Sequence, residues 1–335
     1  MSEAEILPAH EPALFEEAVA RAAAVLRAGG LAALPTETVY GLAANALDTV
    51  AVEAIFKAKG RPPENPIIVH VDGVSMARDC VTEWPEEAEQ LATAFWPGPL
   101  TLVLPKAECI PDGVTAGGGT VGVRWPSHPF MQAVIRACRF PLAAPSANLS
   151  NHLSPTNADH VRAQLGGAVQ LIVDGGQSQV GIESAVVEIA ANGVNVLRPG
   201  MISREALAAA LTGVEVRAGS PGESLKSPGQ MPRHYSPTAR LRVLQWTDDA
   251  DLERQVSASR TPADRVYVIA HTVIPPDTRF GHVSVIPHDA EAYGRALYSE
   301  LHRCDTEGAE LIVVEKPPPT DNWTAITDRL SRAEA

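Results

Sequence analysis

Three basic side chains, Lys57, Lys59 and Arg61, lie within five residues in the stretch KAKGRPPENPIIVH. The chain as a whole is acidic, with 27 Lys and Arg against 40 Asp and Glu residues and a formal net charge of -13. Such a local cluster is suited to one anionic ligand, because Arg grips phosphate oxygens bidentately and Lys acts as a point charge. For Lys57 alone, compensation of a helix dipole is the better explanation.

Other polar side chains lie where apolar runs end. Thr36 follows the run 31–34, Ser146 and Asn148 follow 141–144, and Ser184 and Arg198 border two further runs. Each of them has an ordinary explanation as a turn residue. Together they supply hydroxyl, amide and guanidinium groups with few carboxylates, which suits a pocket for a polyanion and a small polar molecule.

The elements that must position these groups follow from apolar spacing and from helix caps and breakers. We predict helices over 12–28, 49–59, 85–95, 128–137, 156–165 and 203–211. Strands are predicted over 31–34, 66–71, 100–105, 121–125, 141–144, 170–174, 184–189 and 194–198. Because strands and helices do not alternate strictly, the pattern favours an α/β or α+β domain with a twisted mixed sheet. Of these we predict the α/β class, with helices flanking the sheet.

The composition changes near residue 214. The segment 217–240 is rich in Gly, Ser and Pro, which is typical of a linker. After it, strands are predicted over 241–246, 265–271, 282–287 and 310–315. Helices are plausible over 249–258 and 289–304. We therefore expect a first domain over 1–213, a linker over 214–240, and a smaller α/β domain with a mostly parallel, Rossmann-like sheet over 241–335.

Several classes of function are disfavoured. The four cysteines are scattered and form no CxxC pair, so no metal site is expected. Gly117, Gly119 and Gly122 match GxGxxG, but a strand follows them where the dinucleotide fingerprint needs a helix. No apolar run is long enough to cross a membrane and no signal peptide is evident, so a cytoplasmic protein is expected.

The successive stretches PTETVYGL, KAKGRPPENPIIVHV, FWPGPLTLVL, VGVRWPSHP, APSANLSNHLSPT, VDGG, GIESAVVEI and VLRPG resemble those of the threonylcarbamoyl-AMP synthase family, with its YrdC-type domain. They follow one another in order, and the resemblance covers essentially all of residues 15–212. The stretch MPRHYSP, followed by a second α/β domain, is similar to the two-domain form of the family. The end of the chain departs from it, with Asp328 where the resemblance leads us to expect Asn.

The resemblance implies a nucleotidyltransferase that converts L-threonine, bicarbonate and ATP to threonylcarbamoyl-AMP and pyrophosphate. A downstream threonylcarbamoyl transferase complex would then modify an adenosine in tRNA. Mg2+ would be held mainly by ATP and water, since few carboxylates lie in the matching stretches. The acidic net charge indicates that direct tRNA binding is weak or absent.

The resemblance also implies roles for individual residues. Lys59 and Arg61 would be catalytic and face the phosphates. His234 and Tyr235 would belong to a lid within the linker, which would exclude water from a mixed anhydride. The implied ATP-binding residues are Lys59, Arg61, Asn65, Thr120, Ser146, Asn148, Ser154, Arg198, His234 and Tyr235. The implied threonine-binding residues are Thr36, His70, Arg124, Ala144 and Ser184.

Other readings remain open. Carbamoyl transfer of the kind carried out by hydrogenase maturation proteins shares the YrdC-type domain, but the cysteine pairs of those chains are absent here. An RNA-binding module is disfavoured by the net charge, and it predicts a steep dependence of affinity on salt. A purely structural scaffold predicts neither RNA binding nor turnover of ATP.

Overall fold

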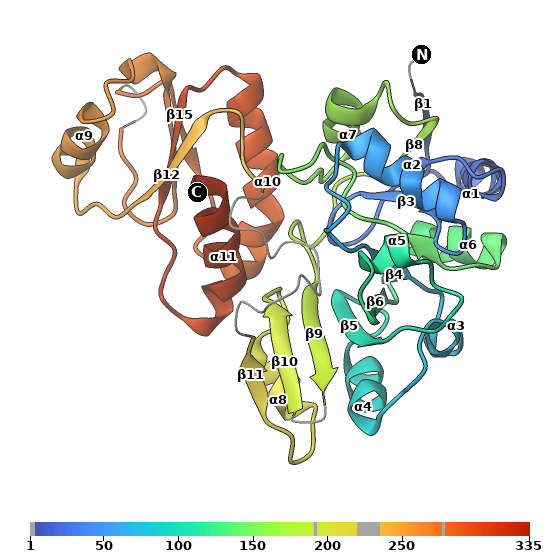
Figure 1. The fold of residues 1–335 in the computed structure, drawn as a ribbon. Coiled ribbons are helices and arrows are strands. Elements are labelled where there is room, and N and C mark those ends of the chain that lie inside the picture. The colour runs from blue at the N-terminus through green and yellow to red at the C-terminus, as the bar shows by residue number, and fades with distance from the viewer. Residues whose placement is uncertain (1–3, 191–192, 220–234, 277–278) are drawn as a thin grey trace. The chain divides into compact units, whose positions relative to one another are not determined.

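The computed structural model describes residues 4–190, 193–219, 235–276 and 279–335 (Figure 1). The chain forms two compact units. The first consists of residues 1–150 and 154–230, and the second of residues 151–153 and 231–335. Each unit has a sheet and a hydrophobic core of its own.

The first unit contains a mixed sheet, which has 11 strands in the described residues, in the order β1-β8-β2-β3-β7-β4-β6-β5-β9-β10-β11. Strands β4 and β6 are parallel, whereas β2 and β3 are antiparallel, so the sheet is mixed as predicted. The strands are Glu5–Pro8 (β1), Ala32–Leu34 (β2), Gly41–Asn45 (β3), Ile68–His70 (β4), Leu100–Pro105 (β5), Thr120–Arg124 (β6), Leu142–Ala143 (β7), Leu171–Asp174 (β8), Ala185–Ala190 (β9), Gly193–Arg198 (β10) and Val216–Ala218 (β11).

Helices connect these strands and cover the sheet. Alternate residues of the central strands enter different cores: Ala33 and Leu42 belong to one hydrophobic cluster, and Leu34 and Ala43 to another. Because successive side chains of a strand point to opposite faces, both faces of the sheet are buried. The helices are Pro12–Arg27 (α1), Thr49–Lys59 (α2), Val74–Asp79 (α3), Glu86–Phe95 (α4), Asp112–Thr115 (α5), Pro129–Cys138 (α6), Ala158–Leu165 (α7) and Arg204–Ala209 (α8).

Helix α2 illustrates how the sequence sets an element that positions the site. The Asp48 side chain accepts hydrogen bonds from two backbone N–H groups of the first turn, at 2.9 and 3.3 Å. Gly60 ends the helix with a φ of 60°, a left-handed conformation that glycine adopts without strain. This helix end fixes where Lys59 and Arg61 leave the helix.

The second unit contains a parallel sheet of four strands in the described residues, in the order β12-β15-β13-β14. Its strands are Arg240–Leu244 (β12), Val266–Ala270 (β13), His282–Val285 (β14) and Leu311–Glu315 (β15). Its helices are Asp249–Ser257 (α9), Ala290–Thr306 (α10) and Thr324–Glu334 (α11), with short 3-10 turns at Ala263–Arg265 and Asp321–Trp323.

Some elements were not predicted. Strand β3 has the sequence GLAAN, which lacks β-branched and aromatic residues and so gives no strand signal of its own. It exists because it pairs with β2 on one side and β7 on the other. Strand β11 lies within the range 214–240 that composition indicates as a linker, and it pairs with β10. Residues 220–234 of that range lie outside the described residues.

Within the described ranges, none of the helices combines the length and the apolar character that crossing a membrane requires.

Candidate active site

Lys59 ends helix α2 with its side chain turned into the protein, where the residue is only 2% exposed. Its Nζ donates to the backbone oxygen of Ser146 at 2.5 Å and to that of Asn148. The Asn148 side-chain oxygen lies 3.4 Å away. Burial, and to a smaller extent the nearby Arg61 charge, lowers the pKa of Lys59. The three oxygens are nevertheless the acceptors that a protonated ammonium group needs.

Arg61 is held by the loop that follows it. Its Nε donates to the backbone oxygen of Asn65 at 3.1 Å, and its Nη2 donates to that of Pro66 at 2.7 Å. Arg61 is 7% exposed and Asn65 is 1% exposed. The cation cluster predicted from sequence is therefore a buried pair, Lys59 and Arg61, whereas Lys57 lies on the exposed side of the helix.

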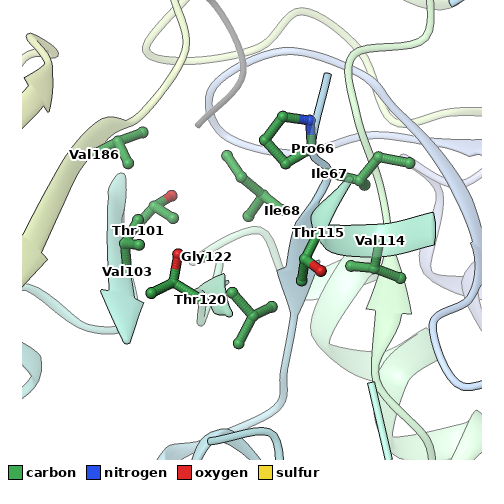
Figure 2. Close-up of a pocket in the computed structure, with 11 residues that line it drawn as sticks. Pro66, Ile67, Ile68, Thr101, Val103, Val114, Thr115, Thr120, Gly122 and Val186 are labelled. Carbon is green, nitrogen blue, oxygen red and sulfur yellow. The ribbon is translucent and has the colours of Figure 1, made fainter. Parts of the chain in front are cut away.

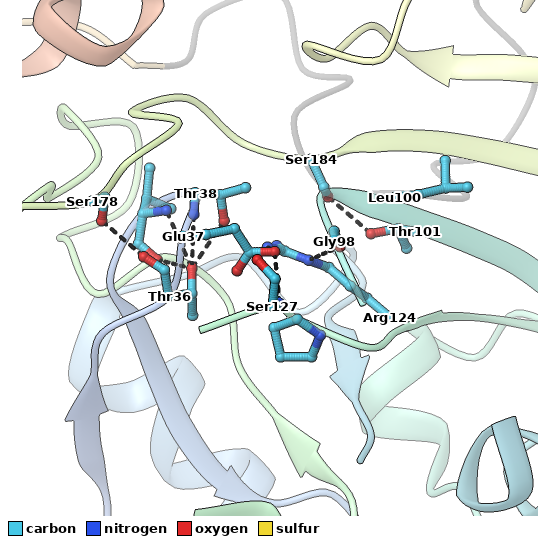
Figure 3. Close-up of polar contacts among 12 residues, drawn as sticks. Thr36, Glu37, Thr38, Gly98, Leu100, Thr101, Arg124, Ser127, Ser178 and Ser184 are labelled. Atoms are coloured by element: carbon cyan, nitrogen blue, oxygen red, sulfur yellow. Dashed lines mark hydrogen bonds and ion pairs between the residues drawn. The ribbon is translucent and has the colours of Figure 1, made fainter. Parts of the chain in front are cut away.

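A second polar group forms around the loop between β2 and β3 (Figure 3). The Thr36 hydroxyl donates to the backbone oxygen of Val39 at 2.6 Å and lies 2.9 Å from the Thr38 hydroxyl. The next residue, Glu37, forms an ion pair with Arg124 at 2.9 Å. Glu37 and Arg124 are 6% and 4% exposed, so this ion pair is buried.

The charge of Glu37 is maintained despite its burial. Burial by itself raises the pKa of this carboxyl group, but the Arg124 guanidinium and the Ser127 N–H, at 3.0 Å, outweigh that effect. The pKa of Glu37 is therefore lowered from its ordinary value. Arg124 is further held by its Nε, which donates to the backbone oxygen of Gly98 at 3.3 Å.

His70 lies beside Arg124, because β4 and β6 pair in parallel with these two residues in register. His70 is 3% exposed, and its Nδ1 has no hydrogen-bond partner within the part of the chain that the structure describes. Burial, with the neighbouring Arg124 charge, lowers the pKa of His70 to about 3. The imidazole is therefore neutral, and its unpartnered Nδ1 distinguishes it from a histidine whose hydrogen bonds are satisfied in a core.

Ser184 connects Arg198, which was predicted, with Thr101, which was not. Its hydroxyl lies 2.8 Å from that of Thr101, and it accepts from Arg198 Nη2 at 3.2 Å. Arg198 Nε also donates to the Ser184 backbone oxygen at 3.1 Å. All three residues are at most 3% exposed. The end of β10 thus brings a guanidinium group to the start of β9.

A pocket lies over strands β4, β5 and β6 (Figure 2). Thr101, Thr120 and Pro66 contribute to its lining, so it lies between the loop that holds Arg61 and the hydroxyl that contacts Ser184. Gly122 helps to keep this space open, because a Cβ there would lie 3.1 Å from the Thr101 methyl carbon. Of the predicted residues, Thr120 is the one that lines this pocket directly.

Three other predicted residues have the following surroundings. Ala144 follows β7, and its N–H donates to the Ile68 backbone oxygen at 3.1 Å. The Ser154 hydroxyl is fully buried and donates to Glu183 at 2.5 Å. Ser146 contributes its backbone oxygen to Lys59.

Tyr235 belongs to the second unit, and His234 lies outside the described residues. Tyr235 is 1% exposed, with its ring 6.0 Å from that of Tyr298 and 5.2 Å from the Arg329 guanidinium carbon. The unexpected Asp328 forms ion pairs with Arg329 at 2.7 Å and Arg332 at 3.0 Å. In this chain, helix α11 thus uses a carboxylate to hold the arginine that lies against Tyr235.

Sequence reasoning missed Glu37, Thr101 and Glu183 as members of the site. Glu37 and Glu183 are carboxylates in short polar stretches next to residues that were chosen, TET and IES, and this adjacency was the available signal. Thr101 lies inside an apolar strand and gives no signal. Among the described residues, no group of three or more His, Cys, Asp or Glu side chains is arranged to hold a metal ion.

Comparisons with known proteins show the family to which the chain is similar. A family model described as "Telomere recombination" matches residues 24–200, and one described as "Threonylcarbamoyl-AMP synthase, C-terminal domain" matches residues 202–335. The chain is 38% identical to the threonylcarbamoyl-AMP synthase of Pyrococcus abyssi, covering 93% of this chain and 92% of the relative. It is 39% identical to that of Bacillus subtilis, covering 94% and 92%.

A solved structure of a relative has a fold similar to that of this chain. The crystal structure of the P. abyssi protein complexed with L-threonine matches with a TM-score of 0.90 at 36% identity. The match covers 98% of this chain and 97% of that chain.

Proposed function

This chain belongs to the threonylcarbamoyl-AMP synthase family, and we propose that its first unit condenses L-threonine, bicarbonate and ATP into threonylcarbamoyl-AMP and pyrophosphate. The relatives carry this name in archaea, bacteria and yeast. A related crystal structure contains L-threonine.

The observation that supports this function most directly is the state of Lys59. Its ammonium group is buried, and its acceptors are backbone and amide oxygens, with no carboxylate within ion-pair distance among the described residues. A buried cation normally has an anionic partner, because leaving a charge uncompensated in the interior is costly. ATP phosphates are the anionic partner that this reaction supplies.

The chemistry requires positioning and charge stabilisation rather than a covalent nucleophile. The neutral threonine amine forms a bond to the carbon of CO2 and gives up a proton, which gives a carbamate. When bicarbonate supplies the carbon, its C–OH bond breaks and the hydroxide leaves with that proton as water. A carbamate oxygen then attacks the α-phosphorus of ATP, and the bond to the β-phosphate oxygen breaks, so that pyrophosphate leaves. Lys59 and Arg61 neutralise charge that develops on the phosphates during this step.

The remaining residues bind the two substrates. On the nucleotide side these are Asn65, Thr120, Ser146, Asn148, Ser154 and Arg198. On the threonine side Arg124 takes the amino acid's carboxylate, and the other contacts come from Thr36, His70, Ala144 and Ser184. Mg2+ arrives with ATP and is held mainly by phosphate oxygens and water.

The proposal extends to the rest of the chain. Residues 1–213 form the catalytic domain, 214–240 a linker that carries the lid residues His234 and Tyr235, and 241–335 the domain that anchors the lid. The product is handed to a threonylcarbamoyl transferase complex that acts on tRNA, with weak or no tRNA binding by this chain. These steps take place in the cytoplasm.

The test is pyrophosphate release from ATP, with L-threonine and bicarbonate each present or omitted. Release should require both substrates and should fall by about 100-fold or more in Arg61→Ala, because a phosphate-facing guanidinium is lost. Lys57→Ala is the matched control, since this exposed lysine of the same helix should leave the rate unchanged. Turnover of ATP without L-threonine would contradict the proposal.

A further inference from the structure

Glu37 is a buried carboxylate with one oxygen unused. Its Oε1 forms an ion pair with Arg124 Nη2 at 2.9 Å and accepts a hydrogen bond from the Ser127 N–H at 3.0 Å. Its Oε2 is buried and has no hydrogen-bond partner in the described parts of the chain. Leaving a buried acceptor without a donor costs about 1–3 kcal/mol. An oxygen in this state therefore indicates that a ligand supplies the donor.

A second unused atom lies beside the same ion pair. His70 Nδ1 is buried and, among the residues described, has no hydrogen-bond partner. His70 is in register with Arg124 across β4 and β6, and its titration responds to the charges of both Arg124 and Glu37. Two residues that adjoin one ion pair, Glu37 and His70, thus each have a buried polar atom with no hydrogen-bond partner among the described residues.

The charges of this group specify the ligand. Arg124 and Glu37 cancel each other, and His70 is neutral. A ligand that brought only a carboxylate to Arg124 would leave one negative charge without compensation in a buried site, which is costly. An α-amino acid carries an ammonium group and a carboxylate on the same carbon. It therefore keeps the site neutral when its carboxylate approaches Arg124 and its ammonium group approaches Glu37.

We propose that Glu37 Oε2 accepts a hydrogen bond from the α-ammonium group of the amino-acid substrate, while Oε1 fixes Arg124 for the substrate carboxylate. This inference rests on the proposed function and names a contact within the same site. It makes Glu37 the residue that selects an amino acid over a 2-hydroxy acid. Its role is binding and not deprotonation, because Arg124 and the Ser127 N–H stabilise its charged form and make it a weak base.

The experiment compares two ligands by calorimetry on the full chain: L-threonine, and the 2,3-dihydroxybutanoate of the same stereochemistry, in which a hydroxyl replaces the ammonium group. The wild type should bind L-threonine about 100-fold more tightly. In Glu37→Gln the affinity for L-threonine should fall by about 30-fold or more, while that for the hydroxy acid should change by less than about threefold. The preference between the two ligands then largely disappears.

Arg124→Gln is the matched variant on the other side of the ion pair. It should weaken both ligands, since both carry the carboxylate. If Glu37→Gln weakens both ligands by the same factor, Glu37 acts only by positioning Arg124 and the ammonium contact is wrong. Circular dichroism and ATP binding establish that each variant is folded.

The affinities of the wild type for L-threonine and for the hydroxy acid test the ammonium contact even if Glu37→Gln fails to fold. Equal affinity of the wild type for the two ligands overturns the ammonium contact. If the wild type also releases pyrophosphate in a threonine-dependent way, only this inference fails. If the wild type neither binds L-threonine nor releases pyrophosphate, the proposed function fails and the inference fails with it.

Discussion

Two buried glutamates, Glu37 in the first unit and Glu315 in the second, have opposite surroundings. Each is 6% exposed, and each lies at or just beyond the end of a strand. The Glu315 carboxylate accepts hydrogen bonds from three consecutive backbone N–H groups, those of residues 271–273, at 2.7, 2.8 and 3.1 Å. The Glu37 carboxylate has one backbone donor and one guanidinium on a single oxygen, and its other oxygen is unused among the described residues.

The location of Glu315 makes the difference informative. It ends β15, and the three amides follow β13, the neighbouring strand. After β13 the chain continues to β14, which lies on the side of β13 away from β15. After β15 it continues to α11, which packs against β12 on the opposite side. Open α/β sheets commonly bind ligands at such a point. Here the amides bind the protein's own carboxylate, so the second unit uses for stability a position that other sheets use for ligands.

The largest expected effect is on the stability of the second unit. Glu315→Ala removes the common acceptor of three buried N–H groups and should lower the free energy of unfolding by about 3–5 kcal/mol. Urea unfolding followed by Trp fluorescence measures this change, since Trp246 and Trp323 are buried in this unit. Below its unfolding temperature the variant should keep its rate of pyrophosphate release to within about threefold, because Glu315 is not among the residues proposed to bind a substrate. A loss of under about 1 kcal/mol would contradict the role given to the three hydrogen bonds.

In the first unit, we expect a substitution at a buried charge to reduce activity strongly and stability only slightly. Lys59→Met keeps the length of the side chain and removes the charge, and it should reduce pyrophosphate release by about 100- to 1000-fold. The free energy of unfolding should change by no more than about 2 kcal/mol, because removing a buried charge offsets the loss of its hydrogen bonds. Parallel assays of rate and urea unfolding measure both quantities. If Lys59→Met loses stability in proportion to its loss of activity, the proposal that Lys59 serves catalysis and Glu315 serves stability is contradicted.

The smallest effect, taken over a single pH unit, is a dependence of stability on pH that arises from His70. In the folded protein the pKa of His70 is about 3, whereas the ordinary value is 6.5. The unfolded chain therefore binds the proton first as the pH falls. Stability due to neutral His70 is fully present above pH 6.5 and is lost between pH 6.5 and 3, at no more than about 1.4 kcal/mol per pH unit. Urea titrations from pH 7 to 4 should show a shallower slope for His70→Gln, and equal slopes would contradict this account.

Helix α2 could be predicted from the sequence, because the signals at its two ends, Asp48 and Gly60, are local. The sequence also led to the prediction, still to be tested, that Lys59 and Arg61 bind an anion. It did not indicate that Lys59 would donate to the backbone of Ser146 and Asn148, since that contact depends on how a helix end meets a loop far along the chain. Any residue can supply a backbone oxygen, so the residue types in the sequence do not indicate which ones accept a hydrogen bond from Lys59.

Glu37 and β3 were missed for related reasons. The partner of Glu37 is Arg124, which is brought near only when the order of the strands is known. Strand β3 depends on its neighbours for its conformation, as its small residues have little strand propensity. What could not be predicted is therefore the set of contacts between distant segments.

The order of strands in the large sheet has a consequence for the synthesis of the chain. Strand β2 lies between β3, which follows it closely, and β8, which ends at Asp174. Strand β1 is in register with β8 as well, with Glu5 opposite Leu171. The amino-terminal strands therefore emerge from the ribosome long before their partner exists. Such high contact order slows folding and leaves apolar strand edges exposed, so we expect the nascent first unit to be prone to aggregation until β8 has been made.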